Sequence, residues 1–162
     1  MLREMWVDRT DYHHTRVVQG DLPALSEGEI LVAIDKFAMT ANNVTYAASA
    51  DMFGYWQFYP AGEDQWGKVT VWDIGEVVES RVDGISVGER LYGFFPMGSH
   101  VVMAPSDISE RGFTDAMAHR QALPGLYNHY ARTQAEPDEL QKLEDQRCIF
   151  FPLFMTGYVI AD

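Results

Sequence analysis

Short apolar runs separated by glycine-containing turns are the feature that most constrains how this chain can fold. The stretch SVGERLYGFFPMGSHVVMAP, residues 86–105, contains a Gly-Glu-Arg turn, an apolar strand, a Gly-Ser turn and a second apolar strand that ends at Pro105. Apolar runs bounded by glycine, serine and proline are typical of β-strands. The stretch therefore predicts the rim of a small β-barrel.

The same pattern extends over the first two-thirds of the sequence. Residues 14–39 contain two β-rich runs that are separated by a polar turn with proline and glycine. Residues 68–82 read as a further strand interrupted at Gly75, where a bulge or a close approach of two backbones is expected. Between these strands, Thr40 can cap a short helix, and an aromatic loop follows at 51–67.

The composition changes after residue 105, and this change predicts a domain boundary there. Residues 1–105 form the predicted β-barrel domain. Residues 106–148 lack clusters of β-branched side chains and predict a helical connector of two helices, the first ending near Pro124 and Gly125. The apolar run at 149–162 predicts the start of a further helix.

The chain is strongly acidic and contains no segment typical of a membrane span or a secretion signal. Its 162 residues carry a formal net charge of −12, which repels phosphate groups, so neither nucleic acid nor an anionic membrane is expected as a partner. No apolar run reaches the roughly 20 residues of a membrane helix. The N-terminal residues MLREMWVDRTDYHH lack an apolar signal core, and we expect a cytoplasmic protein.

A single cysteine limits the chemistry further. Disulfide frameworks and thiolate zinc sites both need several cysteines, so both are excluded. Cys148 lies in the apolar stretch RCIFFPLF, which favours a buried small hydrophobic side chain over a nucleophile.

Three segments together resemble a known family. They are EILVAIDKFAMTANNVTYA, DIGEVVESRVDGISVGERLYGFFPMGSHVVMAP and PLFMTGYVIAD. In this order and spacing, over residues 13–105 and 149–160, they resemble the N-terminal, GroES-like domain of the medium-chain dehydrogenase/reductase superfamily. The stretch HRQALPGLYNHYART further resembles a poorly characterised branch related to quinone and enoyl reductases. The resemblance implies a mainly β (α+β) fold, a partly open GroES-like β-barrel with C-terminal helices.

Two departures from the family pattern are informative. Zinc-dependent members have a cysteine, a following Gly-His-Glu and a four-cysteine lobe, whereas this chain reads FAMTANN at the corresponding place and has one cysteine. We therefore expect a metal-free domain. The family binds NAD(P)H in a Rossmann domain, and no Gly-x-Gly occurs in this sequence. The resemblance then implies that the cofactor is held mainly by a domain absent from this chain, which alone is expected to be inactive.

Candidate catalytic groups cluster in TANNVTY, at the end of a predicted core strand. By resemblance this turn faces the nicotinamide, with Asn42 matching a recurring asparagine of the family. Tyr46 is the best local proton donor or enolate-binding hydroxyl, and Thr40 is a third catalytic candidate. Asn43 and Thr156 are the candidate cofactor-binding residues. The alternatives are an asparagine-rich helix cap that satisfies backbone groups, and a threonine buried in its helix.

A candidate substrate pocket is suggested by aromatic residues. Tyr55 and Trp56 of the aromatic loop, together with Phe94, could wall an apolar pocket. The alternative is that these rings pack into the core of the barrel.

The resemblance implies a function and a set of partners. The expected function is that of the substrate-side domain of a zinc-independent NAD(P)H-dependent oxidoreductase that reduces a carbonyl, a quinone or an activated double bond. The expected partners are a small-molecule substrate and a cofactor domain of the same or a split chain. A homodimer formed through the apolar helix at 152–160 is an alternative partner. The competing function is a non-catalytic, free-standing GroES-like module that binds a small ligand or a protein.

Overall fold

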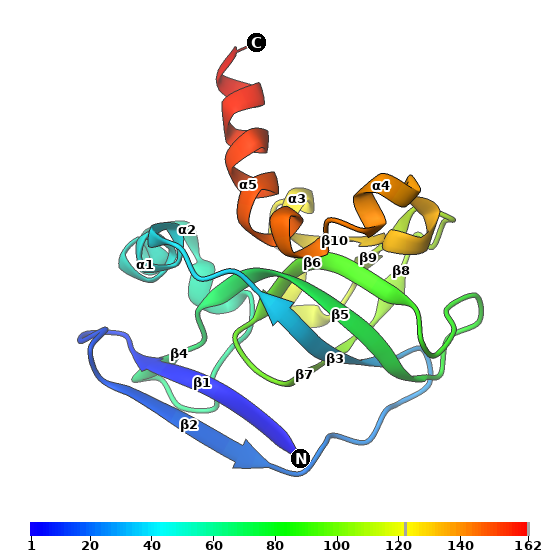
Figure 1. The fold of residues 1–162 in the computed structure, drawn as a ribbon. Coiled ribbons are helices and arrows are strands. Elements are labelled where there is room, and N and C mark those ends of the chain that lie inside the picture. The colour runs from blue at the N-terminus through cyan, green and yellow to red at the C-terminus, as the bar shows by residue number, and fades with distance from the viewer. Residues whose placement is uncertain (122, 162) are drawn as a thin grey trace.

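The computed structural model describes residues 1–121 and 123–161, without the side chains of 156 and 159–161. Within this part the strands form two antiparallel sheets (Figure 1). The smaller sheet has the order β2-β1-β4, with β1 at Leu2–Asp8, β2 at Thr15–Gly20 and β4 at Trp66–Gly67. The larger sheet has seven strands in the order β7-β3-β5-β6-β10-β9-β8. Its strands are β3 (Ile30–Phe37), β5 (Thr70–Ser80), β6 (Arg90–Pro96), β7 (His100–Met103), β8 (Pro105–Ser106), β9 (Gly112–Asp115) and β10 (His129–Arg132).

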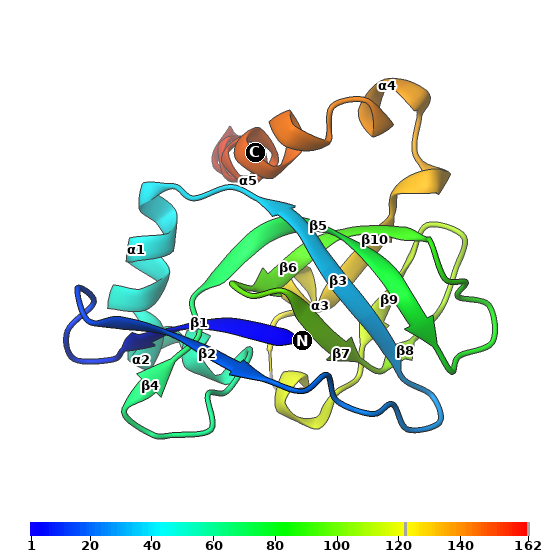
Figure 2. The same ribbon diagram turned by 60° about the horizontal axis from the view of Figure 1, so that its bottom comes forward.

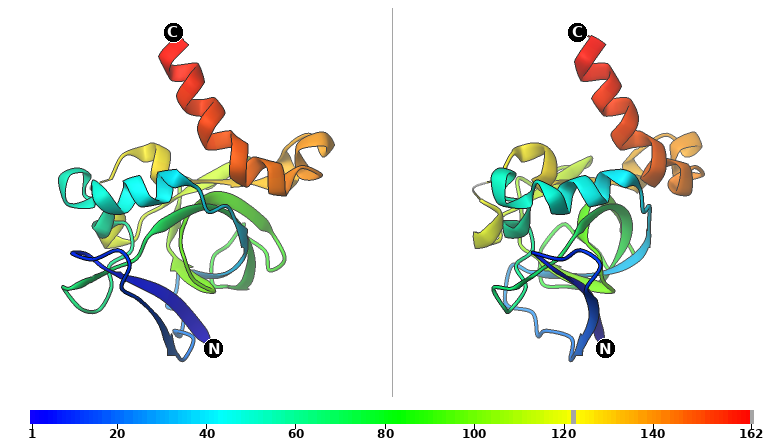
Figure 3. Two further views of the ribbon diagram at one scale, coloured as in Figure 1. Left: turned by 60° about the vertical axis from the view of Figure 1, so that its left-hand side comes forward. Right: turned by 90° about the vertical axis from the view of Figure 1, so that its left-hand side faces the viewer.

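The larger sheet curls into a partly open barrel whose two ends, β7 and β8, are not paired with each other (Figure 3). Its interior is filled by apolar side chains that point inward from several strands. Those with no exposed surface are Ile30, Val32, Val77, Leu91, Phe95, Met103, Phe113 and Tyr130. The arrangement confirms the fold class expected from the sequence, a mainly β chain with a partly open barrel of GroES-like type and C-terminal helices.

Gly75 lies at an irregularity in the pairing of β3 and β5, as the sequence predicts. The pairing of these strands shifts register between Ile34 and Lys36, directly opposite Gly75. A Cβ atom at Gly75 would lie 2.6 Å from Cγ1 of Val32, which is closer than packed carbon atoms approach. The missing side chain therefore lets the barrel wall bend inward at this place.

The helical segments lie between β3 and β4 and in the last third of the chain. The helical segments are α1 (Ala41–Ala48), α2 (Ala50–Phe53), η1 (Tyr55–Gln57), η2 (Ala118–Arg120), α3 (Gly125–Asn128), η3 (Thr133–Ala135), α4 (Asp138–Gln141) and α5 (Glu144–Ala161). Helix α5 projects away from the barrel on the side opposite the β1–β2 hairpin (Figures 1 and 3). Among the described helices, none combines the length and the apolar character that crossing a membrane requires.

The helical character predicted for residues 106–148 is wrong for part of this segment. Strands β9 and β10 lie within it and join the barrel, where β10 pairs with both β6 and β9. Each strand has only four residues, too few for a visible alternation of apolar and polar side chains. Phe113 and Tyr130 are nevertheless fully buried in the barrel, so tertiary packing rather than local propensity decides the structure here.

A buried arginine joins the segment after β9 to the rest of the barrel. The side chain of Arg120 has no exposed surface and lies 3.7 Å from the carboxylate of Asp115, which is equally buried. Its guanidinium donates hydrogen bonds to the amide oxygen of Asn128, to the hydroxyl of Tyr130 and to two backbone carbonyl groups, those of Phe58 and Tyr127. One side chain thus connects the aromatic loop, η2, α3 and β10.

A second buried ionisable residue has no such partner. Asp73 on β5 has no exposed surface, and neither carboxylate oxygen accepts a hydrogen bond from a described residue. Burial is the main cause that raises the pKa of Asp73 to about 9, and the charge of Asp35 adds to it. The backbone N–H groups of Lys36 and Ile74 lie near enough to oppose this rise only in part. Asp73 is therefore a neutral acid in the folded protein at pH 7.

Replacing Arg120 by methionine should strongly destabilise the fold. The substitution leaves two backbone carbonyl groups without their donor and removes the buried cation beside the carboxylate of Asp115, which typically costs about 3–5 kcal/mol. Urea unfolding followed by tryptophan fluorescence measures the loss. Arg111→Met, at an exposed position, is the control and should change the free energy of unfolding by less than about 0.5 kcal/mol. Equal effects of the two changes would show that the buried network does not stabilise the barrel.

The stability of the folded chain should fall as the pH rises because of Asp73. The unfolded chain releases this proton near pH 3.8, while the folded chain holds it up to about pH 9. The stability linked to the bound proton is therefore complete below about pH 4 and is lost progressively as the pH rises to about 9. Asp73→Asn should flatten this dependence and stabilise the protein at pH 8 by more than about 1 kcal/mol. Asp83→Asn, in an exposed turn, should leave the pH profile of unfolding as it is.

Candidate functional site

The first turn of α1 is a capping box built from the predicted site residues. Thr40 has an extended backbone with φ −135° and ψ 171°, and its hydroxyl accepts a hydrogen bond from the N–H of Asn42 at 3.3 Å. In return, the side-chain oxygen of Asn43 accepts from the N–H of Thr40 at 2.7 Å. These bonds satisfy donors that every helix start leaves free. The interpretation as a helix cap is thus confirmed for Thr40 and Asn43.

Asn43 also anchors α1 to the barrel. Its side chain is buried, and its amide nitrogen donates a 2.9 Å hydrogen bond to the carbonyl of Thr70 at the start of β5. Both ends of the amide are therefore engaged with backbone groups. The cofactor-binding role of Asn43 stays a prediction, and its present contacts are structural.

Thr40, Asn42, Asn43 and Tyr46 meet at one cleft between α1 and α5. The α1–α5 cleft is lined by Ala38, Thr40, Asn42, Asn43, Tyr46, Trp72, Cys148, Ile149 and Pro152. Figure 2 shows the chain leaving β3 beside the first turns of α5 before it enters α1. The free volume of the cleft is about 10 Å³, roughly what a single water molecule needs. These four residues, called the ledge below, are thus brought together in a closed arrangement.

Tyr46 is held by aromatic neighbours on its inner side. Its ring lies 5.1 Å from that of Tyr55 and meets that of Phe94 edge-on at 5.5 Å. Burial raises the pKa of the Tyr46 phenol, and a hydrogen bond with the indole of Trp72 opposes the rise. The hydroxyl therefore carries its proton at neutral pH, as a proton or hydrogen-bond donor must.

A cluster of ion pairs fixes the start of α5 over the cleft. Arg90 on β6 donates two hydrogen bonds, of 2.7 and 2.8 Å, to the carboxylate of Glu144 and a third to Asp35. Lys36 lies 3.2 Å from Glu144 and 3.0 Å from Asp145. Hydrogen bonds from Arg90 lower the pKa of Glu144. Two carboxylates in the first turn also complement the helix dipole.

Cys148 lines the cleft, and its thiol is not activated. Its side chain is buried, and its thiol lies 3.9 Å from the carbonyl of Lys36. Burial is the main cause that raises the pKa of the Cys148 thiol to about 12, so the nucleophilic thiolate is absent at neutral pH. The interpretation of Cys148 as a buried small side chain is confirmed.

The three residues predicted to wall a substrate pocket pack largely against the protein itself. Phe94 has no exposed surface and is enclosed by aromatic rings, and Trp56 is buried beside α1. Tyr55 is partly exposed and stacks on Phe58 at 5.4 Å. The pocket stays a prediction for Tyr55. Contact between a substrate and Phe94 would require the surrounding rings to move.

Two other predictions concern Thr156 and a metal site. Thr156 lies within α5, but its side chain is outside the described part, so its contact with a cofactor stays a prediction. Among the described residues, no three His, Cys, Asp or Glu side chains gather as metal ligands.

Sequence reasoning did not identify Trp72 as part of the site. It lies on β5 with Ile74, on the face covered by α5, and its ring is 6.4 Å from Phe151. One feature of the sequence could have identified Trp72. Along a strand, Trp72 and Ile74 alternate with Val71 and Asp73, so a second largely apolar face of β5 is visible in the sequence. The second face of this strand only becomes a site wall because α5 returns to it from 70 residues further along the chain.

The fold of this chain is similar to part of one solved structure. Its fold aligns with part of the crystal structure of CurA from Vibrio vulnificus, with a TM-score of 0.48 and 17% sequence identity. The alignment covers 67% of this chain and 31% of the CurA chain, so the chain spans about a third of that protein. No curated protein matches the sequence.

A family model matches the chain from the last residue of β3 to the C-terminal end. Its description is "Protein of unknown function (DUF2855)", and the match covers residues 37–162. This range includes α1, the α1–α5 cleft and most of the barrel. The chain therefore belongs to the DUF2855 family.

Proposed function

We propose that this chain is the substrate-side domain of a zinc-independent, NAD(P)H-dependent oxidoreductase that reduces a carbonyl, a quinone or an activated double bond. The observation that carries the proposal is the convergence of Thr40, Asn42 and Tyr46 on the α1–α5 cleft. The sequence resemblance to the medium-chain dehydrogenase/reductase superfamily supports the same assignment, because it gives these residues a place beside a nicotinamide.

The described residues do not form a complete cofactor site. A cleft of about 10 Å³ accommodates neither a nicotinamide ring nor a substrate, and the sequence has no glycine-rich phosphate loop. We therefore assign NAD(P)H binding to a separate domain, on the same chain or on a split partner. We also propose that the protein is cytoplasmic.

The ledge residues would act on the substrate oxygen. When bound, the cofactor supplies hydride, and negative charge then develops on the oxygen of the substrate. The Tyr46 phenol keeps its proton at neutral pH and can donate it to this oxygen, or hydrogen-bond to it. The amide of Asn42 and the hydroxyl of Thr40 lie at the same cleft and can orient the substrate by further hydrogen bonds.

The exposed surface of α5 suggests where the cofactor domain lies. Among the side chains of this helix that the structure describes, five apolar ones are substantially exposed, although the helix starts over the cleft. They are Ile149, Phe150, Leu153, Phe154 and Tyr158. Apolar side chains in such number on one element mark an interface. We assign this interface to the cofactor domain, with a second copy of the chain as the alternative.

Replacing Tyr46 by phenylalanine should lower turnover by tenfold to a hundredfold without a comparable change in KM, because only the donor to the substrate oxygen is lost. The assay follows NAD(P)H oxidation by the complete gene product with a quinone, an enone and an aldehyde. Tyr127→Phe is the matched control, because this ring lies in the same aromatic layer without lining the cleft, and it should change kcat by less than about twofold.

Unchanged turnover in the Tyr46→Phe protein would remove this residue from the mechanism. Absence of NAD(P)H oxidation with every substrate, together with no NAD(P)H binding by calorimetry, would overturn the proposed function. That result would favour the competing assignment, a module that binds a small ligand or a protein without catalysis.

A further inference from the structure

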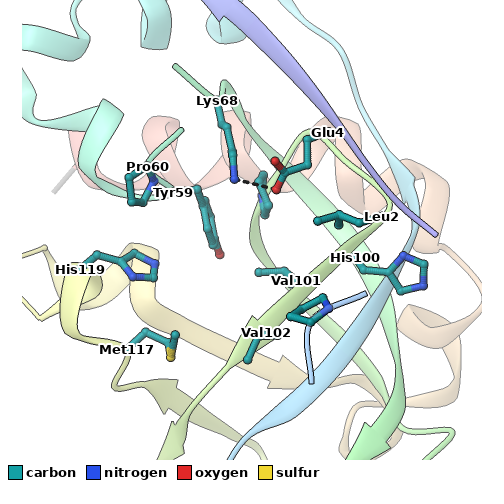
Figure 4. A pocket seen from close by; sticks show the side chains of 12 residues that line it. Leu2, Glu4, Tyr59, Pro60, Lys68, His100, Val101, Val102, Met117 and His119 are labelled. Atoms are coloured by element: carbon teal, nitrogen blue, oxygen red, sulfur yellow. Dashed lines mark hydrogen bonds and ion pairs between the residues drawn. The ribbon is translucent and has the colours of Figure 1, made fainter. Parts of the chain in front are cut away.

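A second cavity lies between the small sheet and the barrel (Figure 4). Its volume is about 270 Å³. The β1–β7 cavity is lined by Leu2, Glu4, Pro23, Tyr59, Pro60, Lys68, Pro96, His100, Val101, Val102, Met117 and His119. It shares no lining residue with the α1–α5 cleft, so its properties do not depend on the proposed function.

An ion pair at one side of this cavity leaves hydrogen-bond donors unused. The ammonium of Lys68 lies 2.6 Å from one carboxylate oxygen of Glu4, and the indole N–H of Trp6 donates to the other oxygen at 2.9 Å. The side chains of Lys68 and Glu4 are 14% and 16% exposed. A lysine ammonium has three donors, and within the described residues Lys68 donates only this one hydrogen bond. Both oxygens of Glu4 are occupied, whereas Lys68 can still donate.

The cavity has no net charge at neutral pH. Lys68 and Glu4 compensate each other. His119 lies beside the ring of Tyr59, with 6.2 Å between the ring centres, and burial lowers its pKa. Burial likewise lowers the pKa of His100, whose Nδ1 is 3.0 Å from the hydroxyl of Ser99. Both imidazoles are therefore neutral at pH 7, and a charged ligand would gain no compensating charge.

The remaining walls are apolar and stiff. Leu2, Val101, Val102 and Met117 surround the space opposite and beside the ion pair (Figure 4). Three proline rings, at positions 23, 60 and 96, complete the wall, and proline fixes its own backbone angle. A preformed apolar cavity with a few polar groups is the usual form of a small-molecule site.

We propose that the β1–β7 cavity is a binding site for a small uncharged molecule with a compact apolar body and one carbonyl or amide oxygen. The oxygen accepts a hydrogen bond from the free donors of Lys68, and the apolar body lies against Val101, Val102 and Met117. The lack of net charge in the cavity and the chain's net charge of −12 both select against an anionic ligand.

Acetophenone is a suitable probe, because it joins one carbonyl oxygen to a compact ring. Titration of the ¹⁵N-labelled chain should shift the backbone amide signals of Lys68, Val101, Val102 and His119, with residues around the α1–α5 cleft unaffected. Ethylbenzene, which lacks the acceptor, and benzoate, which adds a negative charge beside Glu4, should each bind at least about tenfold more weakly.

Variants of the ion pair test the role of Lys68. Lys68→Met keeps the length of the side chain and removes its donors, and it should weaken acetophenone binding about tenfold or more while ethylbenzene binding changes little. Because this change strands the Glu4 carboxylate, the double variant Glu4→Gln with Lys68→Met provides a folded alternative without either charge. Lys142→Met, at an exposed position in the segment before α5, is the control and should bind acetophenone like the parent chain.

Two results would overturn the proposal. The first is the absence of shifts at the cavity residues up to the solubility limit of acetophenone. The second is equal affinity of the parent chain and the folded double variant, which would show that Lys68 serves only to pair with Glu4.

Discussion

The buried guanidinium of Arg120 is the interaction on which the rest of the molecule depends. A fully buried charge is costly unless its donors find acceptors, and here the acceptors come from the aromatic loop, α3 and β10, with the carboxylate of Asp115 on β9 3.7 Å away. Two of them are backbone carbonyls, of Phe58 and Tyr127, whose positions no side-chain substitution can adjust. The guanidinium therefore fixes the path of the backbone at Phe58 and at Tyr127.

This constraint reaches the α1–α5 cleft through a layer of aromatic rings. Phe58 stacks on Tyr55 and meets the rings of Phe94 and Tyr127 edge-on, at 5.3 and 5.2 Å. Tyr55 and Phe94 in turn support the inner side of Tyr46. Aromatic pairs of this kind add to the stabilisation from burial. The position of Tyr46, the proposed proton donor, thus depends on the guanidinium of Arg120, which lies on the other side of this aromatic layer.

Local patterns predicted the barrel strands and the capped helix, because in both cases the determining interactions are close in sequence. Gly75 and Thr40 are examples: each shows its role within a few residues of itself. Strands β9 and β10 were missed because Phe113 and Tyr130 gain their burial from distant partners. Arg120 was not recognised either, since a lone arginine between histidines is indistinguishable in sequence from one at the surface. The β1–β7 cavity beside Lys68 was missed for the same reason, because its walls come from segments about 100 residues apart.

The two sides of the α1–α5 cleft differ in how firmly they are held. The α1 side rests on a buried amide and a packed aromatic layer, both of which are expensive to disrupt. The α5 side rests partly on the packing of Cys148 and Phe151 against β5 and β6. The rest comes from ion pairs whose cations, Lys36 and Arg90, are 37% and 29% exposed, and pairs of this kind contribute on the order of 0–1 kcal/mol each. If a substrate enters this cleft, α5 is therefore the element that yields, while the ledge with Tyr46 stays in place. A partner that binds the apolar side chains of α5 would then control access to the cleft through the weaker of its two walls.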